Sequence, residues 1–310
     1  MYVLILFLFL LSGMGNSVQA CDVCSGGLGG GDMGVLPQFT RHFAGVRYRF
    51  GMGKASHAGL ASEASIKDEF HSTELWVRYV PHPRVQLVCN LPFSVNVQQG
   101  IQSNSRVHGL GDITLQTQII LWNTAWSGKP RLFNHLLLVG IGIKSPSGVY
   151  QLRENGQTIH PNRQPGSGSW DIPFNFLYSF RRGAWGLQLE WMYRLNTTNS
   201  LYRKAGDRLS SGMRVFYLWN RKKWSVMPAS GLVFEWQDAD QLRNKPVDMT
   251  GGNALYLQSG LDLFYSFFST GIRADYPVYQ YFTGGRNGLR ISAQFLFLFS
   301  SLNKKKSNQL

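Results

Sequence analysis

The stretch "WDIPFNFLYSF", residues 170–180, places a large apolar side chain at every second position. Its two sets of alternate residues are an aromatic set, Trp170, Ile172, Phe174, Phe176, Tyr178 and Phe180, and a more polar set, Asp171, Pro173, Asn175, Leu177, Ser179 and Arg181. A period of two predicts an extended strand with two different faces. The second set is too polar for a protein core, so we expect the two faces to meet different environments.

The same alternation recurs about twelve times along the chain, with no helical period between the repeats. These segments are longer than the ~5–6 residues of ordinary globular strands and match the ~9–11 residues that a tilted strand needs to cross a membrane. The predicted strands are 39–50, 72–80, 84–98, 110–122, 132–144, 169–180, 184–195, 208–219, 224–237, 253–267, 270–279 and 288–300.

The connections between these strands alternate between short and long. Short ones include "PHP" at 81–83, "RRGA" at 181–184 and "NRKK" at 220–223. The long ones, rich in Gly, Ser and Asn, are 51–71, 99–109, 145–168, 196–207, 238–252 and 280–287. Outer-membrane barrels show this asymmetry, with short periplasmic turns and longer loops outside. We therefore predict an all-β protein, a transmembrane antiparallel up-and-down β-barrel of about 12 strands, with a soluble β-sandwich as the alternative.

The composition agrees with a membrane barrel. Of the 310 residues, 44% are hydrophobic and only 15% are charged, below the ~25% usual in soluble domains. Only helices and closed barrels can cross a bilayer, because every backbone polar group there needs a partner within the protein. The aromatic face should therefore meet lipid and the polar face a lumen. Interface girdles are predicted from Trp170, Trp185, Trp219, Trp224 and Trp236, which lie near strand ends.

The N-terminal segment predicts export. An apolar run from Tyr2 to Leu11 is followed by small and polar residues up to Ala20, which is typical of a signal peptide over residues 1–20, although no Lys or Arg precedes the run. In "CDVC", Cys21 and Cys24 leave three alternatives open: lipidation of Cys21, a disulfide, or ordinary cleavage before them. Residues 21–36 form a Cys/Gly-rich leader or plug, residues 37–300 the barrel, and residues 301–310 a basic tail.

The register predicts which side chains point into the lumen. Charges of both signs share this face with a few apolar residues, so the alternatives are an ion-pair network that holds the wall together and a constriction that selects solutes. The lumen-lining candidates are Arg47, Glu74, Trp76, Arg78, Asp112, Asp171, Glu190, Arg194, Arg214, Glu235, Tyr256, Asp262, Phe264, Arg273 and Arg290. Arg49, Lys144, Arg181, Asp275, Leu296 and Leu298 are expected on the same face, whereas Cys89 is expected to face lipid.

The sequence shows no pattern typical of a catalytic, metal-binding or nucleic-acid-binding site. The seven histidines have no ligand spacing, so neither a metal nor another cofactor is expected. Asp171 with His160 is too little for a catalytic pair. The net charge of +14 is scattered over connections, strands and tail, which argues against a nucleic-acid partner.

Three segments, "GLGDITL" (109–115), "GIKSPSGVY" (142–150) and "QPGSGSWD" (164–171), resemble the outer-membrane barrels named for the meta pathway of phenol degradation. "CDVC" followed by "GVLPQFTRHFAGVRYRF" is similar to the version found in Bacteroidetes-type bacteria. The resemblance implies an outer-membrane barrel that passes or binds small molecules, with apolar or aromatic ones as candidates. It implies no catalytic residues.

The expected function is that of a channel or transporter for small solutes in the bacterial outer membrane, not that of an enzyme. The alternative is a plugged structural or binding barrel with partner-binding loops. Expected partners are membrane lipids, a small-molecule solute and the outer-membrane assembly machinery. Because twelve strands enclose less space than the 16–18 of porins, we expect slow and selective passage.

Overall fold

The structure is a computed structural model, and it describes residues 41–55, 66–99, 104–127, 132–154, 156–221, 223–282 and 285–299. The predicted signal peptide, the leader with Cys21 and Cys24, and the basic tail lie outside these residues. None of the helices within them has the length and apolar character needed to span a membrane.

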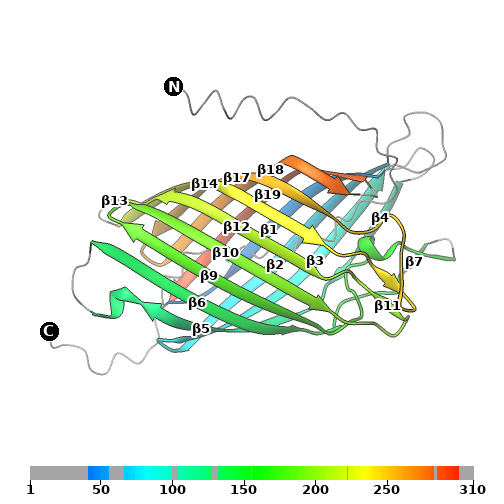
Figure 1. The fold of residues 1–310 in the computed structure, drawn as a ribbon, viewed down its shortest axis with the longest axis horizontal. Coiled ribbons are helices and arrows are strands. Elements are labelled where there is room, and N and C mark those ends of the chain that lie inside the picture. Colours follow the sequence, from blue (N-terminus) through cyan, green and yellow to red (C-terminus); the bar gives the residue numbers. More distant parts are fainter. Residues whose placement is uncertain are drawn as a thin grey trace.

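Twelve long strands close into one antiparallel barrel, which confirms the predicted fold class (Figure 1). The first of them pairs with the last, so that His42 lies opposite Phe299 and the sheet has no open edge. The barrel strands are β1 (His42–Ala55), β2 (Ile66–His82), β3 (Val85–Gln99), β5 (Thr114–Asn123), β6 (Phe133–Lys144), β9 (Asp171–Arg182), β10 (Trp185–Asn196), β12 (Arg208–Tyr217), β14 (Trp224–Gln237), β17 (Gly252–Tyr265), β18 (Phe268–Phe282) and β19 (Gly285–Phe299).

The two ends of the barrel differ, as the connection lengths predict. At the short-turn end, two residues suffice between β2 and β3, between β9 and β10 and between β17 and β18, while the 3-10 helix η1 (Thr124–Ser127) and β13 (Trp219–Arg221) occupy two other connections. The loop end, on the right in Figure 1, carries the short elements β4 (Asn104–Leu110), β7 (Arg153–Glu154), β8 (Gln157–Thr158), η2 (Pro161–Arg163), β11 (Arg203–Lys204), β15 (Gln241–Leu242) and β16 (Lys245–Pro246).

Three predicted loops at this end are wrong in extent. β18 and β19 together continue through most of 280–287, and β1 and β2 extend into 51–71. In these extensions β19 pairs with β1, so that Gly285 lies opposite Ala55 and Asn287 opposite Gly53. Segment 99–109 contains most of β4, which pairs with β3, so the predicted strand 110–122 begins only at Thr114. A Gly- and Asn-rich composition indicates a turn, but the ladder bonds use backbone groups, which these residues also supply.

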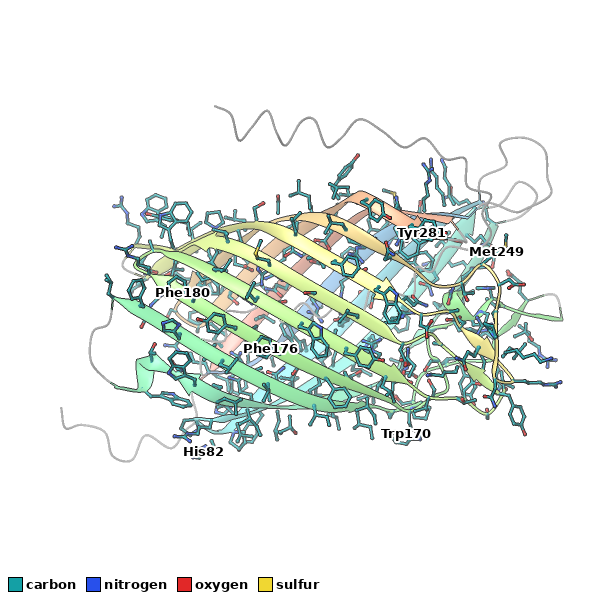
Figure 2. All side chains as sticks on the ribbon, viewed as in Figure 1. His82, Trp170, Phe176, Phe180, Met249 and Tyr281 are labelled. Carbon is teal, nitrogen blue, oxygen red and sulfur yellow. The ribbon has the colours of Figure 1, made fainter. Side chains whose placement is uncertain are left out.

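The predicted faces of residues 170–180 are confirmed. Along β9, Asp171, Pro173, Asn175, Leu177 and Ser179 are buried, while the side chains that alternate with them are half-buried or exposed. Figure 2 shows Trp170, Phe176 and Phe180 on the outer surface of the barrel. In a closed barrel, the buried positions of each strand are those that face the lumen.

Exposed tryptophans lie at both ends of the outer surface, as expected for interface girdles. Trp185, Trp219 and Trp224 are at the short-turn end, whereas Trp170 and Trp236 are at the loop end, and all five are between 36% and 62% exposed. Cys89 is a free thiol, half-buried, and lies two residues from the exposed Leu87.

Candidate functional site in the barrel lumen

The structure places the predicted lumen residues on the inner face of the barrel. Four of them are half-buried: Glu190, Arg194, Glu235 and Arg290. Their contacts, described below, are with other residues of the inner face. The buried ones are Arg47, Glu74, Trp76, Arg78, Asp112, Asp171, Arg214, Tyr256, Asp262, Phe264 and Arg273.

The first charged group joins the neighbouring strands β1 and β2. Arg47 lies opposite Glu74 in the register and donates to it from Nε at 2.8 Å and from Nη2 at 2.6 Å. Arg49 forms a second ion pair with the same carboxylate. The Arg47 guanidinium also lies 4.5 Å from the ring centroid of Trp76, a cation–π contact. One carboxylate therefore holds two guanidinium groups against the wall.

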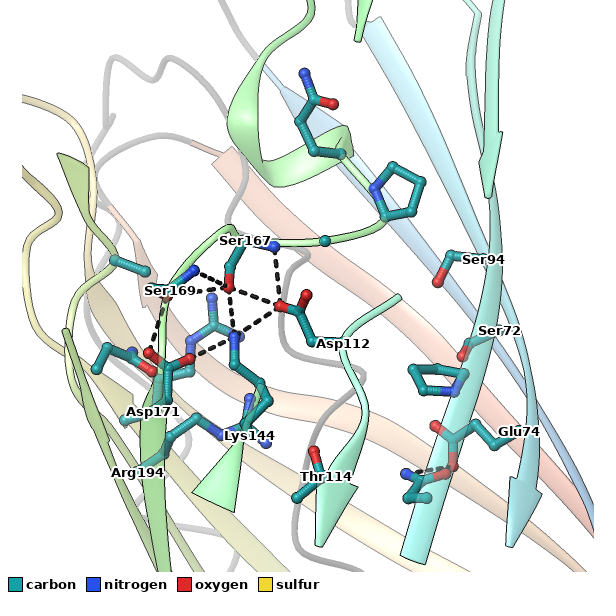
Figure 3. A pocket seen from close by; sticks show the side chains of 18 of the residues that line it. Ser72, Glu74, Ser94, Asp112, Thr114, Lys144, Ser167, Ser169, Asp171 and Arg194 are labelled. Atoms are coloured by element: carbon teal, nitrogen blue, oxygen red, sulfur yellow. Dashed lines mark hydrogen bonds and ion pairs between the residues drawn. The ribbon is translucent and has the colours of Figure 1, made fainter. Parts of the chain in front are cut away.

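The second group lies at the loop end and is shown in Figure 3. Lys144 Nζ is 2.9 Å from Asp112 Oδ2, and it also pairs with Asp171. Asp112 in turn accepts from the backbone N–H groups of Gly148 and Ser167, each at 2.9 Å. The three segments that carry the family resemblance each contribute to this network, which fixes the connection 145–170 to the barrel.

Further ion pairs join residues of β10, β12, β14, β17, β18 and β19. Arg290 donates to Glu235 at 2.9 and 3.0 Å, lies 3.7 Å from Asp275, and sits 3.8 Å from the ring centroid of Tyr256. Arg214 pairs with Glu190 at 2.8 Å and Arg273 with Asp262 at 3.3 Å. Arg181 is half-buried near the end of β9. Many of the inward charges are thus paired around the wall, as groups at membrane depth usually are.

The connection 145–170 folds over the lumen at the loop end. Its buried Arg163 donates to Gln98 Oε1 at 3.0 Å and to Ser105 Oγ at 2.6 Å, while Asn96 donates to the Arg163 carbonyl at 2.8 Å. Glycine is required where this connection crosses itself, because a Cβ on Gly166 would lie 2.6 Å from the Gly148 carbonyl carbon. Sequence reasoning read this segment as a loop and missed Arg163, since nothing local marks a loop arginine as buried.

A cavity of about 360 Å³ lies inside the barrel between these groups. Tyr150, Thr158 and Asp240 line it toward the loop end, and Arg78, Gln86 and Leu138 line it toward the short turns. Its size falls within the ~300–1,000 Å³ range of small-molecule sites. The lumen is therefore not filled along its whole length.

Apolar side chains gather on the inner face at the short-turn end. Trp76, Phe264, Leu296 and Leu298 were expected there, but the extent of the group was not. We call it the apolar belt; it comprises three buried clusters, Phe43, Trp76, Leu296 and Leu298; Ile120, Leu136, Leu138 and Leu177; and Phe216, Leu218, Met227 and Phe264. Because its members come from strands around the barrel, the belt narrows the lumen from several sides.

Asp171 and His160, which were considered as a catalytic pair, have separate partners. Asp171 is held by Lys144 and by the Ser169 hydroxyl at 2.9 Å. His160 caps η2, where its Nδ1 accepts from the Asn162 N–H at 3.4 Å. Within the ranges that the structure describes, no three His, Cys, Asp or Glu side chains come together as metal ligands.

Comparisons with known proteins concern the fold. No protein-family model matches the chain, and no curated protein matches it. Among solved structures, it is similar to an outer membrane channel from Pseudomonas putida F1, with a TM-score of 0.63 and 18% identity over 87% of this chain and 98% of that one. The beta domain of the Bordetella autotransporter BrkA (TM-score 0.46, 10% identity, covering 83% of this chain and 99% of that one) and the translocator domain of NalP from Neisseria meningitidis (0.43, 12%, 83% and 88%) are more distant.

Proposed function

We propose that this chain is a channel or transporter of the bacterial outer membrane for small solutes, apolar or aromatic molecules among them, without enzymatic activity. The observation that carries the proposal is the cavity of about 360 Å³ inside a closed membrane barrel. The similarity of the fold to an outer membrane channel from Pseudomonas putida F1 supports it. The family resemblance of the three loop segments supports an aromatic or apolar solute.

The order of side chains along the lumen suggests how such a solute is selected. From the loop end it passes the charged wall around Lys144 and Glu74 before it reaches the apolar belt. An apolar constriction is costly for ions, because they would lose hydration there, whereas an apolar solute keeps favourable contacts. The belt would therefore favour solutes with an apolar part over inorganic ions.

The test uses the purified full-length chain in planar bilayers with potassium chloride. We expect small, resolved conductance steps that are reduced when phenol is added. Leu138→Ser, which makes the belt polar, should raise the ionic conductance severalfold because ions then cross a less apolar constriction. Leu137→Ser alters the neighbouring, half-exposed residue of the same strand and should leave conductance unchanged. Silent bilayers with both the natural chain and Leu138→Ser would contradict a channel.

Such silence would favour the second candidate, a plugged structural or binding barrel. The specific observation behind it is the connection 145–170, which Asp112 and Arg163 fix across the lumen. In that role the loops would bind a partner and the ion pairs would serve only to hold the wall. Lipid contacts of the aromatic outer face belong to both candidates, and so does recognition by the outer-membrane assembly machinery, which remains a prediction.

A further inference from the structure

The cavity wall carries more positive than negative charge. Among the described residues that line it, seven are Lys or Arg and four are Asp or Glu. Each of these carboxylates already forms an ion pair: Glu74 with Arg47 and Arg49, Asp112 and Asp171 with Lys144, and Asp240 with Arg203. By count, the wall carries more cations than carboxylates.

Two of these cations lie on neighbouring strands. Arg194 on β10 lies directly opposite Arg208 on β12, and both line the cavity. The charges of Arg208 and Arg49 act repulsively on Arg194, whereas Asp171 and Asp112 attract it while they also hold Lys144. Like charges directly opposite on neighbouring strands destabilise a sheet. An anion bound among the three guanidinium groups would relieve this repulsion.

Arg49 shows an unused donor at the same place. Its side chain lines the cavity and is only 9% exposed, and its Nε atom has no hydrogen-bond partner within the described part of the chain. A buried N–H group without an acceptor is unfavourable. A carboxylate oxygen is a strong acceptor for a guanidinium N–H group, so it suits this donor.

Apolar side chains border the same cavity. Met192 lies two residues before Arg194, Phe70 lies across the cavity on β2, and both line it. Farther toward the short turns, the cavity reaches Trp76 and Leu138 of the apolar belt. A ligand with one charged end and an apolar body would contact both kinds of wall.

We propose that Arg49, Arg194 and Arg208 form a binding site for the carboxylate of a small organic acid whose apolar part packs against Phe70 and Met192. The site deepens the proposed function by naming a solute class, and it rests on that function only for transport, since binding is measurable without it.

The experiment measures binding by titration calorimetry on the full-length chain in detergent at fixed ionic strength. Sodium benzoate is the ligand, with benzyl alcohol as its uncharged analogue and inorganic phosphate as an anion without an apolar part. We expect Arg208→Gln to raise the Kd for benzoate about tenfold or more, because a charge-assisted bond is lost. Binding of benzyl alcohol should be weak and unchanged.

Arg106→Gln is the matched control, because Arg106 is exposed on β4 at the same end of the barrel. Arg49→Gln provides a second test in case Arg208→Gln does not fold, and heat-modified migration on a gel reports folding of each variant. The proposal is overturned if the natural chain binds no benzoate, if benzyl alcohol or phosphate binds as well as benzoate, or if Arg106→Gln weakens benzoate as much as the cavity variants.

The two experiments test the binding site and the channel separately. Benzoate binding that depends on Arg208 in a chain silent in planar bilayers would contradict the channel and support this site. Conductance steps in a chain that does not bind benzoate would support the channel and contradict this site.

Discussion

The loop-end and short-turn-end halves of the lumen are built from the same strands but use opposite kinds of contact. β6 and β9 supply Lys144 and Asp171 at the loop end, and Leu138 and Leu177 at the short-turn end. All four side chains point inward. A period of two therefore determines which face a residue occupies, while the chemistry of that face varies along the barrel axis.

The difference has an energetic consequence. Apolar contacts in the belt are non-directional and tolerate small changes of position. The Lys144 network instead depends on each partner, because loss of one member leaves another charge buried without compensation. It also ties three segments of the chain together, which non-directional packing could not specify. The loop end should thus be more sensitive to single substitutions than the short-turn end.

The largest expected effect is that of Lys144→Met. It leaves Asp112 and Asp171 buried without their cation and should lower the free energy of unfolding by ~3–5 kcal/mol. Urea unfolding followed by tryptophan fluorescence measures it. Lys245→Met, at an exposed position of β16, is the control and should change little. Adding Asp112→Asn and Asp171→Asn to Lys144→Met should recover much of the loss; equal effects at Lys144 and Lys245 would contradict a structural role of the network.

An intermediate effect is expected for Leu177→Ala in the belt. Leu177 is fully buried against Leu138, and its truncation should cost ~2–3 kcal/mol, at the low end for buried leucines because the adjacent lumen offers room for repacking. The same unfolding assay measures it, and Leu132→Ala, at a 63% exposed position, is the matched control. A loss larger than that of Lys144→Met would reverse the order of the two halves.

The smallest effect should come from Arg163→Met. The substitution removes the bonds to Gln98 and Ser105 but keeps the one from Asn96 to the Arg163 carbonyl, so we expect a loss of ~1–2 kcal/mol, local to the connection 145–170. Amide hydrogen exchange should quicken in that connection and not in β6 or β9. Arg153→Met, exposed on β7, should leave exchange unchanged. Faster exchange throughout the barrel would show that this connection supports the wall rather than resting on it.

Sequence reasoning assigned the candidate site residues to one face of the strands but could not show their contacts. Arg47 and Glu74 were both predicted to point inward, and this prediction needed only the alternating pattern of each strand. That Glu74 holds both Arg47 and Arg49 depends on the register between β1 and β2. Residues 280–287 show the converse, because their composition indicated a loop, whereas the pairing of β18 with β17 and of β19 with β1 made most of them strand.

The sequence by itself determined the twelve-strand pattern, the lipid and lumen faces and the tryptophan positions, because side chains alternate on any extended backbone whatever it pairs with. Only the tertiary structure decided that Asp112, Lys144 and Asp171 meet, that Arg163 is buried, and that Leu177, one apolar residue in a polar set, belongs to a belt. These contacts join residues far apart in the chain, and barrel closure and register bring them together.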